Sequence, residues 1–105
     1  MARWVEACAV GDLVPDDVLP FVDGEREYAV YRTRDDEYYA SDGRCTHQGA
    51  RLCEGLVFNG FIECPKHNGR FDLRTGRVVR PPAMVDLATY PTRVEAGRVY
   101  VDLED

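Results

Sequence analysis

Short apolar segments separated by turn residues run through the whole chain. Segments rich in Val, Tyr, Phe and Ile alternate with Gly, Pro, Asn and Asp at intervals of roughly ten residues, which is typical of an all-β sandwich or barrel. No stretch of the sequence shows a convincing helical periodicity. The predicted strands are Arg3–Ala9, Val18–Val22, Glu27–Arg32, Glu37–Ser41, Leu56–Phe58, Phe61–Cys64, Arg70–Asp72, Arg93–Glu95 and Arg98–Asp102.

Two dipeptides predict tight hairpin turns, Asn59-Gly60 and Ala96-Gly97. Asn-Gly between apolar runs is the strongest short hairpin signal, because both residues tolerate positive φ. The stretch "GLVFNGFIEC" has this form. We therefore expect the chain to fold back at Asn59, which brings the loops on either side of the hairpin to the same end.

Length and charge narrow the classes of protein that remain. A chain of 105 residues forms one domain with one modest core, so we expect a single functional site. Thirteen basic and nineteen acidic residues give a formal net charge of −6, which argues against general nucleic-acid binding. The start contains Glu6 and no apolar run that fits a signal peptide, and no later stretch fits a membrane span. We expect a soluble, cytoplasmic protein.

Both histidines and two of the four cysteines fall in two compact motifs. Cys45 and His47 form C-x-H, and Cys64 and His67 form C-x-x-H. Thiols stay reduced in the cytoplasm, so these cysteines indicate metal binding or reactivity rather than disulfides. Cys8 and Cys53 have no obvious partner and are expected to pack as small apolar side chains.

Three chemistries could use two mixed Cys/His motifs. A single zinc ion accepts two thiolates and two imidazoles, although the usual zinc finger does not mix them within a pair. A Cys–His nucleophilic dyad would need no second copy and shows no orienting third group. A [2Fe–2S] cluster with both thiolates on one iron and both imidazoles on the other suits mixed motifs, because each loop then reaches both irons. The cluster is the favoured interpretation, and zinc stays open.

At these residues the sequence resembles the Rieske-type [2Fe–2S] proteins. The stretches "CTHQGARLCEG" and "CPKHNGRFDLRTGRVVRPPA" are similar to the ligand loops of the small Rieske ferredoxins of bacterial ring-hydroxylating dioxygenase systems. The resemblance implies one cluster held by Cys45, His47, Cys64 and His67. It also implies the Rieske fold, an antiparallel β-sandwich or barrel base formed by residues 1–42 and 84–105, with a cluster-binding subdomain inserted at residues 43–83.

The resemblance points to further residues around the cluster. Pro81 and Pro82 match a proline-containing loop over the cluster, and the candidates for nearby or docking contacts are Gln48, Lys66, Gly69, Arg70 and Pro82. Residues 44–80 are locally basic, whereas both ends of the chain are acidic, so either surface could dock a partner.

The chain departs from the respiratory Rieske proteins in two respects. Ala50 and Lys66 match the positions of a disulfide between the ligand loops there, and Gly69 and Phe71 match a serine and a tyrosine that hydrogen-bond the cluster. Lost hydroxyl donors destabilise the reduced cluster. We therefore expect a reduction potential near about −150 mV, at the low end of the Rieske range.

The function that the resemblance implies is one-electron transfer. Both histidines are assigned to the cluster, so none is left for the mononuclear iron of an oxygenase. We expect a monomeric, non-enzymatic carrier between a flavin-dependent NAD(P)H reductase and a terminal oxygenase. Two alternatives stay open: a non-diffusing Rieske subunit of a larger redox enzyme, such as the nitrite reductase small subunit, and a zinc-stapled interaction module.

Overall fold

Antiparallel β-sheets build the protein, as the sequence pattern predicts. The computed structural model describes residues 1–47, 49–66 and 68–104. Within these ranges there is no α-helix, only two short 3₁₀ turns, η1 (Val10–Asp12) and η2 (Leu52–Glu54). No helix there is long and apolar enough to cross a membrane.

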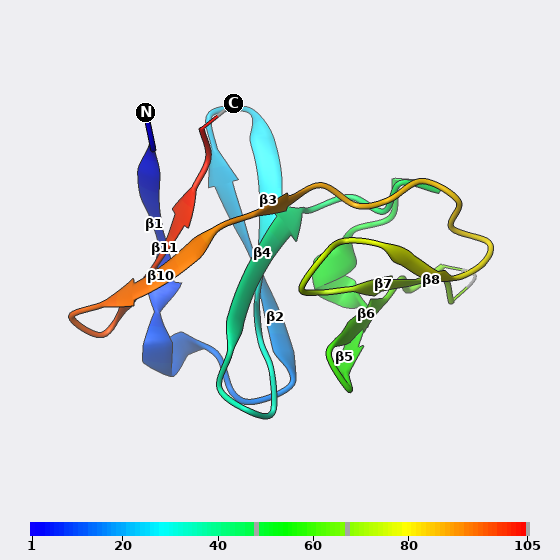
Figure 1. The fold of residues 1–105 in the computed structure, drawn as a ribbon, viewed down its shortest axis with the longest axis horizontal. Helices are drawn as coiled ribbons and strands as arrows, with labels where there is room; N and C mark the ends of the chain where they lie inside the picture. Colours follow the sequence, from blue (N-terminus) through cyan, green and yellow to red (C-terminus); the bar gives the residue numbers. More distant parts are fainter. Residues whose placement is uncertain (48, 67, 105) are drawn as a thin grey trace.

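Two sheets form one part of the molecule, on the left in Figure 1. The first has the order β1-β11-β10, from β1 (Trp4–Ala9), β11 (Arg98–Asp102) and β10 (Thr92–Glu95). The second has the order β2-β3-β4-β9, from β2 (Asp17–Asp23), β3 (Arg26–Arg32), β4 (Tyr38–Asp42) and β9 (Thr89–Tyr90). Both chain termini lie at one end of these sheets (Figure 1).

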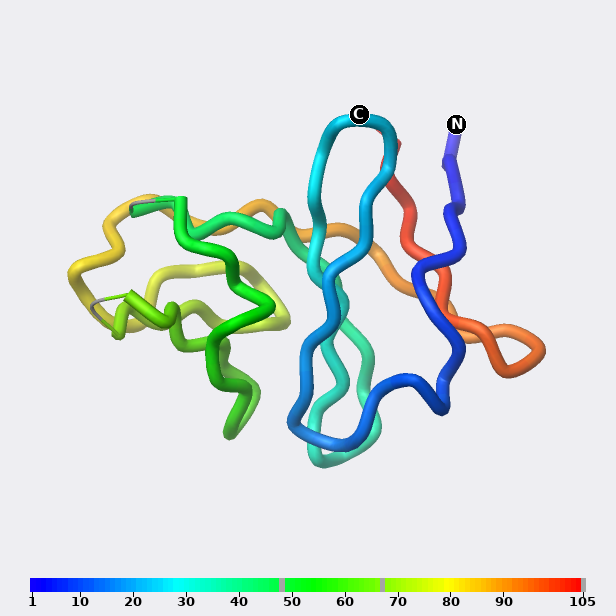
Figure 2. The backbone as a smooth tube through the Cα atoms, turned by 180° about the vertical axis from the view of Figure 1, so that it is seen from behind, coloured from blue at the N-terminus to red at the C-terminus, as the bar shows by residue number. Residues whose placement is uncertain are grey.

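The third sheet lies to one side of the other two, as the two opposite views show (Figures 1 and 2). Its order is β5-β6-β7-β8, from β5 (Leu56–Phe58), β6 (Phe61–Glu63), β7 (Arg70–Asp72) and β8 (Val78–Arg80). All neighbouring strands in it run antiparallel. The motif-bearing loops flank the β5–β6 hairpin of this sheet.

Both predicted hairpin turns are confirmed. Asn59 and Gly60 have φ values of 51° and 79°, and Phe58 pairs with Phe61 across them. Ala96 and Gly97 have φ values of 51° and 78° between β10 and β11. Positive φ at both central residues is the backbone geometry that favours Asn-Gly.

The strand predictions differ from the structure at a few places. The first strand begins at Trp4 rather than Arg3, and β6 ends at Glu63, so Cys64 lies in the loop that follows. Two strands, β8 and β9, were not predicted. Both are very short, and β8 joins its neighbour through an irregular register next to Arg70, so neither leaves a clear alternating pattern in the sequence.

One apolar core joins the third sheet to the second. Tyr31 and Ala29 of β3 pack in the same cluster as Leu52, Ile62 and Phe71, and all five are fully buried. Cys45, Cys64 and Ala83 belong to this cluster as well. Cys8 and Cys53 are half-buried against the cores, in agreement with their expected apolar packing. The core therefore anchors the loops that carry the predicted ligands.

Candidate metal centre

The two motif-bearing loops close in the same way. The backbone N–H of Cys45 donates to the carbonyl oxygen of Ala50 at 2.8 Å, and that of Cys64 donates to the carbonyl of Gly69 at 2.7 Å. In each loop the residue just before the acceptor has positive φ, 69° at Gly49 and 61° at Asn68. Gly and Asn adopt this left-handed conformation more readily than most residues. Two separate sequences thus form two closely matched turns that each begin with a cysteine.

The hairpin of β5 and β6 connects these turns, as its Asn-Gly sequence predicts. A bridge pairs Arg44 with Arg51 at the base of the first loop, and Leu56 pairs with Glu63 at the base of the second. The Arg44 side chain also donates to the carbonyl of Gly49 at 3.2 Å. Backbone and side-chain hydrogen bonds therefore hold both loops at the same end of the hairpin.

Cys45 and Cys64 meet in the core as buried free thiols, 3% and 2% exposed. Burial raises the pKa of the Cys64 thiol to about 11, and the adjacent Cys45 raises it as well, whereas the backbone N–H of Lys66 lowers it. Two buried thiolates side by side need a compensating positive charge. This donor set fits an iron held by both sulfurs, because a cation removes the thiol protons and neutralises the pair.

The imidazoles are placed differently from the thiols. His47 is exposed in the first loop, whereas His67 and Gln48 lie outside the described residues. Within the described part of the chain, no group of three or more His, Cys, Asp and Glu side chains is arranged to hold a metal ion. The structure thus brings the two thiols together and places His47 at the surface end of its loop.

A third loop, residues 81–86, lies against both of the others. The Thr46 hydroxyl donates to the carbonyl of Val85 at 2.6 Å. A Cβ on Gly69 would lie 3.0 Å from the Cβ of Ala83, so glycine permits this close approach. The peptide bond between Pro81 and Pro82 is cis, and Pro82 is half-buried. The proline-containing segment therefore contacts the loop of Cys45 and the loop of Cys64.

Two hydrogen bonds close the base of the third loop. The N–H of Leu87 donates to the carbonyl of Gly76 at 2.7 Å, and the N–H of Val78 donates to Asp86 Oδ1 at 2.9 Å. Gly76 has a φ of 77°, and a Cβ there would lie 2.0 Å from the Leu87 carbonyl oxygen. Only glycine fits this closure without a shift of the backbone.

The predicted docking residues differ in their surroundings. Lys66 is exposed. Arg70 instead pairs with Glu63, at 2.8 Å between Nε and Oε1, and its guanidinium lies 4.8 Å from the centre of the Phe58 ring. The sequence reasoning did not single out Thr46 or Glu63. Thr46 lies inside the C-x-H motif, and this position could have identified it. Glu63 has no sequence signal other than its position directly before Cys64.

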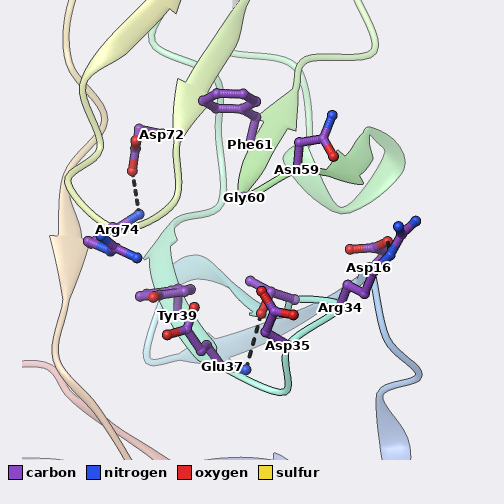
Figure 3. Close-up of a pocket in the computed structure, with 11 residues that line it drawn as sticks. Asp16, Arg34, Asp35, Glu37, Tyr39, Asn59, Gly60, Phe61, Asp72 and Arg74 are labelled. Carbon is purple, nitrogen blue, oxygen red and sulfur yellow. Dashed lines mark hydrogen bonds and ion pairs between the residues drawn. The ribbon is translucent and has the colours of Figure 1, made fainter.

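A separate cleft of about 410 Å³ lies between the β3–β4 turn and the Asn59-Gly60 hairpin (Figure 3). It is lined by Asp16, Arg34, Glu37, Asp72 and Arg74, among others, and none of the described ligand candidates, Cys45, His47 and Cys64, lines it. Arg34 pairs with Asp16 at 3.4 Å, and the N–H of Arg74 donates to Asp72. The cleft and the cysteine loops are different features of the molecule.

Comparison with known proteins identifies the class. The family model of the Rieske [2Fe-2S] domain matches residues 3–91. The chain therefore belongs to the Rieske [2Fe–2S] family, whose members carry a Rieske-type cluster. The resemblance noted from the two ligand motifs is confirmed, and so is the all-β Rieske fold.

Individual relatives show which kind of Rieske protein this chain resembles. The ferredoxin component of the naphthalene 1,2-dioxygenase system of Pseudomonas putida is 41% identical over 96% of each chain. The anthranilate 1,2-dioxygenase ferredoxin subunit of Burkholderia cepacia is 36% identical over 98% of this chain and 94% of its own. Both are named as ferredoxins and not as catalytic subunits, so this chain is a Rieske electron carrier rather than an enzyme.

Solved structures agree with this identification. A complex of reduced oxygenase and oxidised ferredoxin in carbazole 1,9a-dioxygenase matches with a TM-score of 0.88 and 36% identity, over 94% of this chain and 92% of that one. The ferredoxin of Sphingomonas yanoikuyae B1 matches with a TM-score of 0.89 and 31% identity, over 97% and 100%. A nitrite reductase small subunit from Mycobacterium tuberculosis has a TM-score of 0.89 at 24% identity, which shows a shared fold alone.

Proposed function

We propose that Cys45 and Cys64 hold one iron of the [2Fe–2S] cluster and that His47 and His67 hold the other. The contact between the two buried thiols is the observation that carries this assignment, because it joins two motifs that are distant in sequence. The matched closure of the two loops supports it. When bound, the cluster accepts and releases one electron.

The protein passes this electron from a flavin-dependent NAD(P)H reductase to a terminal oxygenase of the ring-hydroxylating type. The relatives that are ferredoxin components of dioxygenase systems support this role. The exposed position of His47 supports a route from the cluster to the surface. The carrier acts as a monomer in the cytoplasm.

The division of the chain follows the sheets. Residues 1–42 and 84–105 form the base, and residues 43–83 form the cluster-binding subdomain. The third sheet, which runs from Leu56 to Arg80, falls entirely within the second of these ranges. Lys66 and the rim of the ligand loops form the docking face, and the ion pair of Arg70 with Glu63 makes Arg70 a supporting residue.

Electron transfer in a reconstituted system tests the proposal. The purified protein is reduced with dithionite, freed of excess reductant and mixed anaerobically with an oxidised oxygenase component of a naphthalene dioxygenase system. We expect stoichiometric reoxidation of the carrier, followed by NADH-dependent product formation when a reductase is added. A Cys45→Ser variant serves as the control without a complete ligand set. A protein that holds its cluster and reduces no oxygenase of this class would contradict the proposed role.

A further inference from the structure

Charged side chains form one row across the sheet that carries the second ligand loop. Glu63 of β6 pairs in register with Arg70 of β7, and Arg70 pairs with Arg80 of β8. Glu63 Oε1 accepts from Arg70 Nε at 2.8 Å and lies 3.8 Å from Nη1 of the Arg80 guanidinium. One carboxylate oxygen therefore joins three neighbouring strands.

This row lies at the base of two loops that meet at the metal centre. Glu63 comes directly before Cys64, and Arg70 comes directly after Gly69, whose carbonyl accepts the N–H of Cys64. Arg80 comes directly before Pro81 and the third loop. The ion pairs thus join the last residue of β6, the first residue of β7 and the last residue of β8 at the points where these strands meet the loops.

The environment of Glu63 favours a defined geometry. Its side chain is 14% exposed, compared with 31% for Arg70 and 49% for Arg80. The Arg70 guanidinium also packs over the Phe58 ring. Partly buried charges interact more strongly than exposed ones, and an unpaired charge there is costly. The guanidinium of Arg70 is therefore held from two sides.

We infer that Glu63 is a positioning residue for the cluster loops and a determinant of the reduction potential. Through Arg70 it holds both ends of the loop from Cys64 to Gly69, and through Arg80 it holds the strand that leads into residues 81–86. Its negative charge compensates two cations beside the centre. This inference rests on the proposed cluster site at Cys45 and Cys64.

The charges of these side chains determine the direction in which each substitution shifts the reduction potential. Reduction adds one negative charge to the cluster. Removal of the Glu63 carboxylate leaves two cations uncompensated, which favours the reduced form and raises the potential. Removal of the Arg80 cation has the opposite effect and lowers the potential.

Three variants of the holoprotein test this inference: Glu63→Gln, Arg80→Gln and, as a matched control, Glu54→Gln. Glu54 is a nearby carboxylate that is 62% exposed and pairs with Arg51 at 3.6 Å. The measurements are the rate at which a chelator strips the cluster, followed by visible absorbance, and the potential from protein-film voltammetry. Glu63→Gln keeps the size of the side chain and removes its charge.

We expect cluster loss on the order of tenfold faster in Glu63→Gln, because a charged hydrogen bond becomes a neutral one, and no comparable change in Glu54→Gln. We expect the potential to rise in Glu63→Gln and to fall in Arg80→Gln. A double variant, Glu63→Arg with Arg70→Glu, restores the slow cluster loss because it restores the ion pair. Shifts of one sign in both single variants, or unchanged kinetics in Glu63→Gln, would overturn the inference. A wild-type protein that binds no cluster would instead overturn the proposed function.

Discussion

The hydroxyl of Thr46 donates a 2.6 Å hydrogen bond to the carbonyl oxygen of Val85, which ties the loop of Cys45 to the proline-containing loop. A neutral hydrogen bond contributes about 0.5–1.5 kcal/mol. We expect Thr46→Val to release the cluster to a chelator roughly two- to tenfold faster than the wild type, because the two loops separate more easily.

Thr92→Val is the matched control for this variant. Thr92 Oγ1 donates to the carbonyl of Tyr38 at 2.7 Å, which is a bond of the same kind between strands of the base. This control should lower the melting temperature and leave the release rate unchanged. Equal release rates in wild type and Thr46→Val would show that the bond does not hold the loops in place.

The ligand assignment predicts a sharp difference among the four cysteines. Cys45→Ser and Cys64→Ser should abolish the bound iron and the visible absorbance, because each removes a thiolate from the buried pair. Cys8→Ser and Cys53→Ser should keep both, since these half-buried thiols pack at the edges of the apolar cores. Iron and sulfide analysis of the four purified variants shows which cysteines the cluster requires. A cluster retained by Cys45→Ser would remove that residue from the ligand set.

The reduction potential is expected at about −150 mV, the low end of the Rieske range. Gly69 and Phe71 carry no hydroxyl that could donate to a cluster sulfur. Without such donors the extra electron of the reduced cluster is less stabilised. Protein-film voltammetry measures the value directly, and a potential above zero would contradict this reasoning.

The free energy of unfolding should fall at alkaline pH, because the Tyr90 hydroxyl ionises there. Burial, followed by the hydrogen bond from its hydroxyl to Asp42 Oδ1 at 2.6 Å, raises the pKa of Tyr90 to about 12. An exposed tyrosine in the unfolded chain has a pKa of about 10. The unfolded chain therefore loses this proton first, so the contribution is complete below about pH 10 and is lost as the pH rises toward about 12.

Tyr90→Phe removes the titrating group and tests this pH dependence. The free energy of unfolding is measured by denaturant titration from neutral pH to about pH 12 in both proteins. The advantage of the wild type over the variant should shrink across the alkaline range. A constant difference would show that Tyr90 does not contribute to the alkaline loss. Tyr31, whose pKa burial also raises, is present in both proteins and cancels in the comparison.

The hairpin between β10 and β11 offers a stabilising substitution. Ala96 has a φ of 51° at the first central position of the turn, where Asn is preferred. We expect Ala96→Asn to raise the free energy of unfolding by about 0.5–1 kcal/mol. Ala88→Asn, a change at an exposed residue outside the positive-φ positions, should have little effect. A melting temperature unchanged by Ala96→Asn would contradict this expectation.

The sequence was informative wherever a local rule determines the structure. Asn59 and Gly60 specify a turn by their own backbone preferences, so the hairpin and the relation of the two loops could be predicted. The four ligand candidates were recognisable because Cys and His are rare in the chain and fall into two motifs. A short strand such as β8 could not be predicted, since its pairing depends on an irregular register with β7.

The long-range contacts around the metal centre could not be predicted from the sequence either. The bond from Thr46 to Val85 depends on the path of a loop that begins with two prolines. The pairing of Arg70 with Glu63 depends on the register of β6 and β7, whereas the sequence alone suggested Arg70 only as a candidate for contacts near the cluster or with a partner. These contacts follow from the way the sheet places distant residues side by side.

The central claim is that one Rieske-type cluster is held by Cys45, His47, Cys64 and His67. An EPR spectrum of the dithionite-reduced protein tests it most directly. We predict an average g value below that of all-cysteine [2Fe–2S] clusters, because imidazoles ligate one iron. A silent spectrum from a colourless protein that contains zinc would contradict the claim.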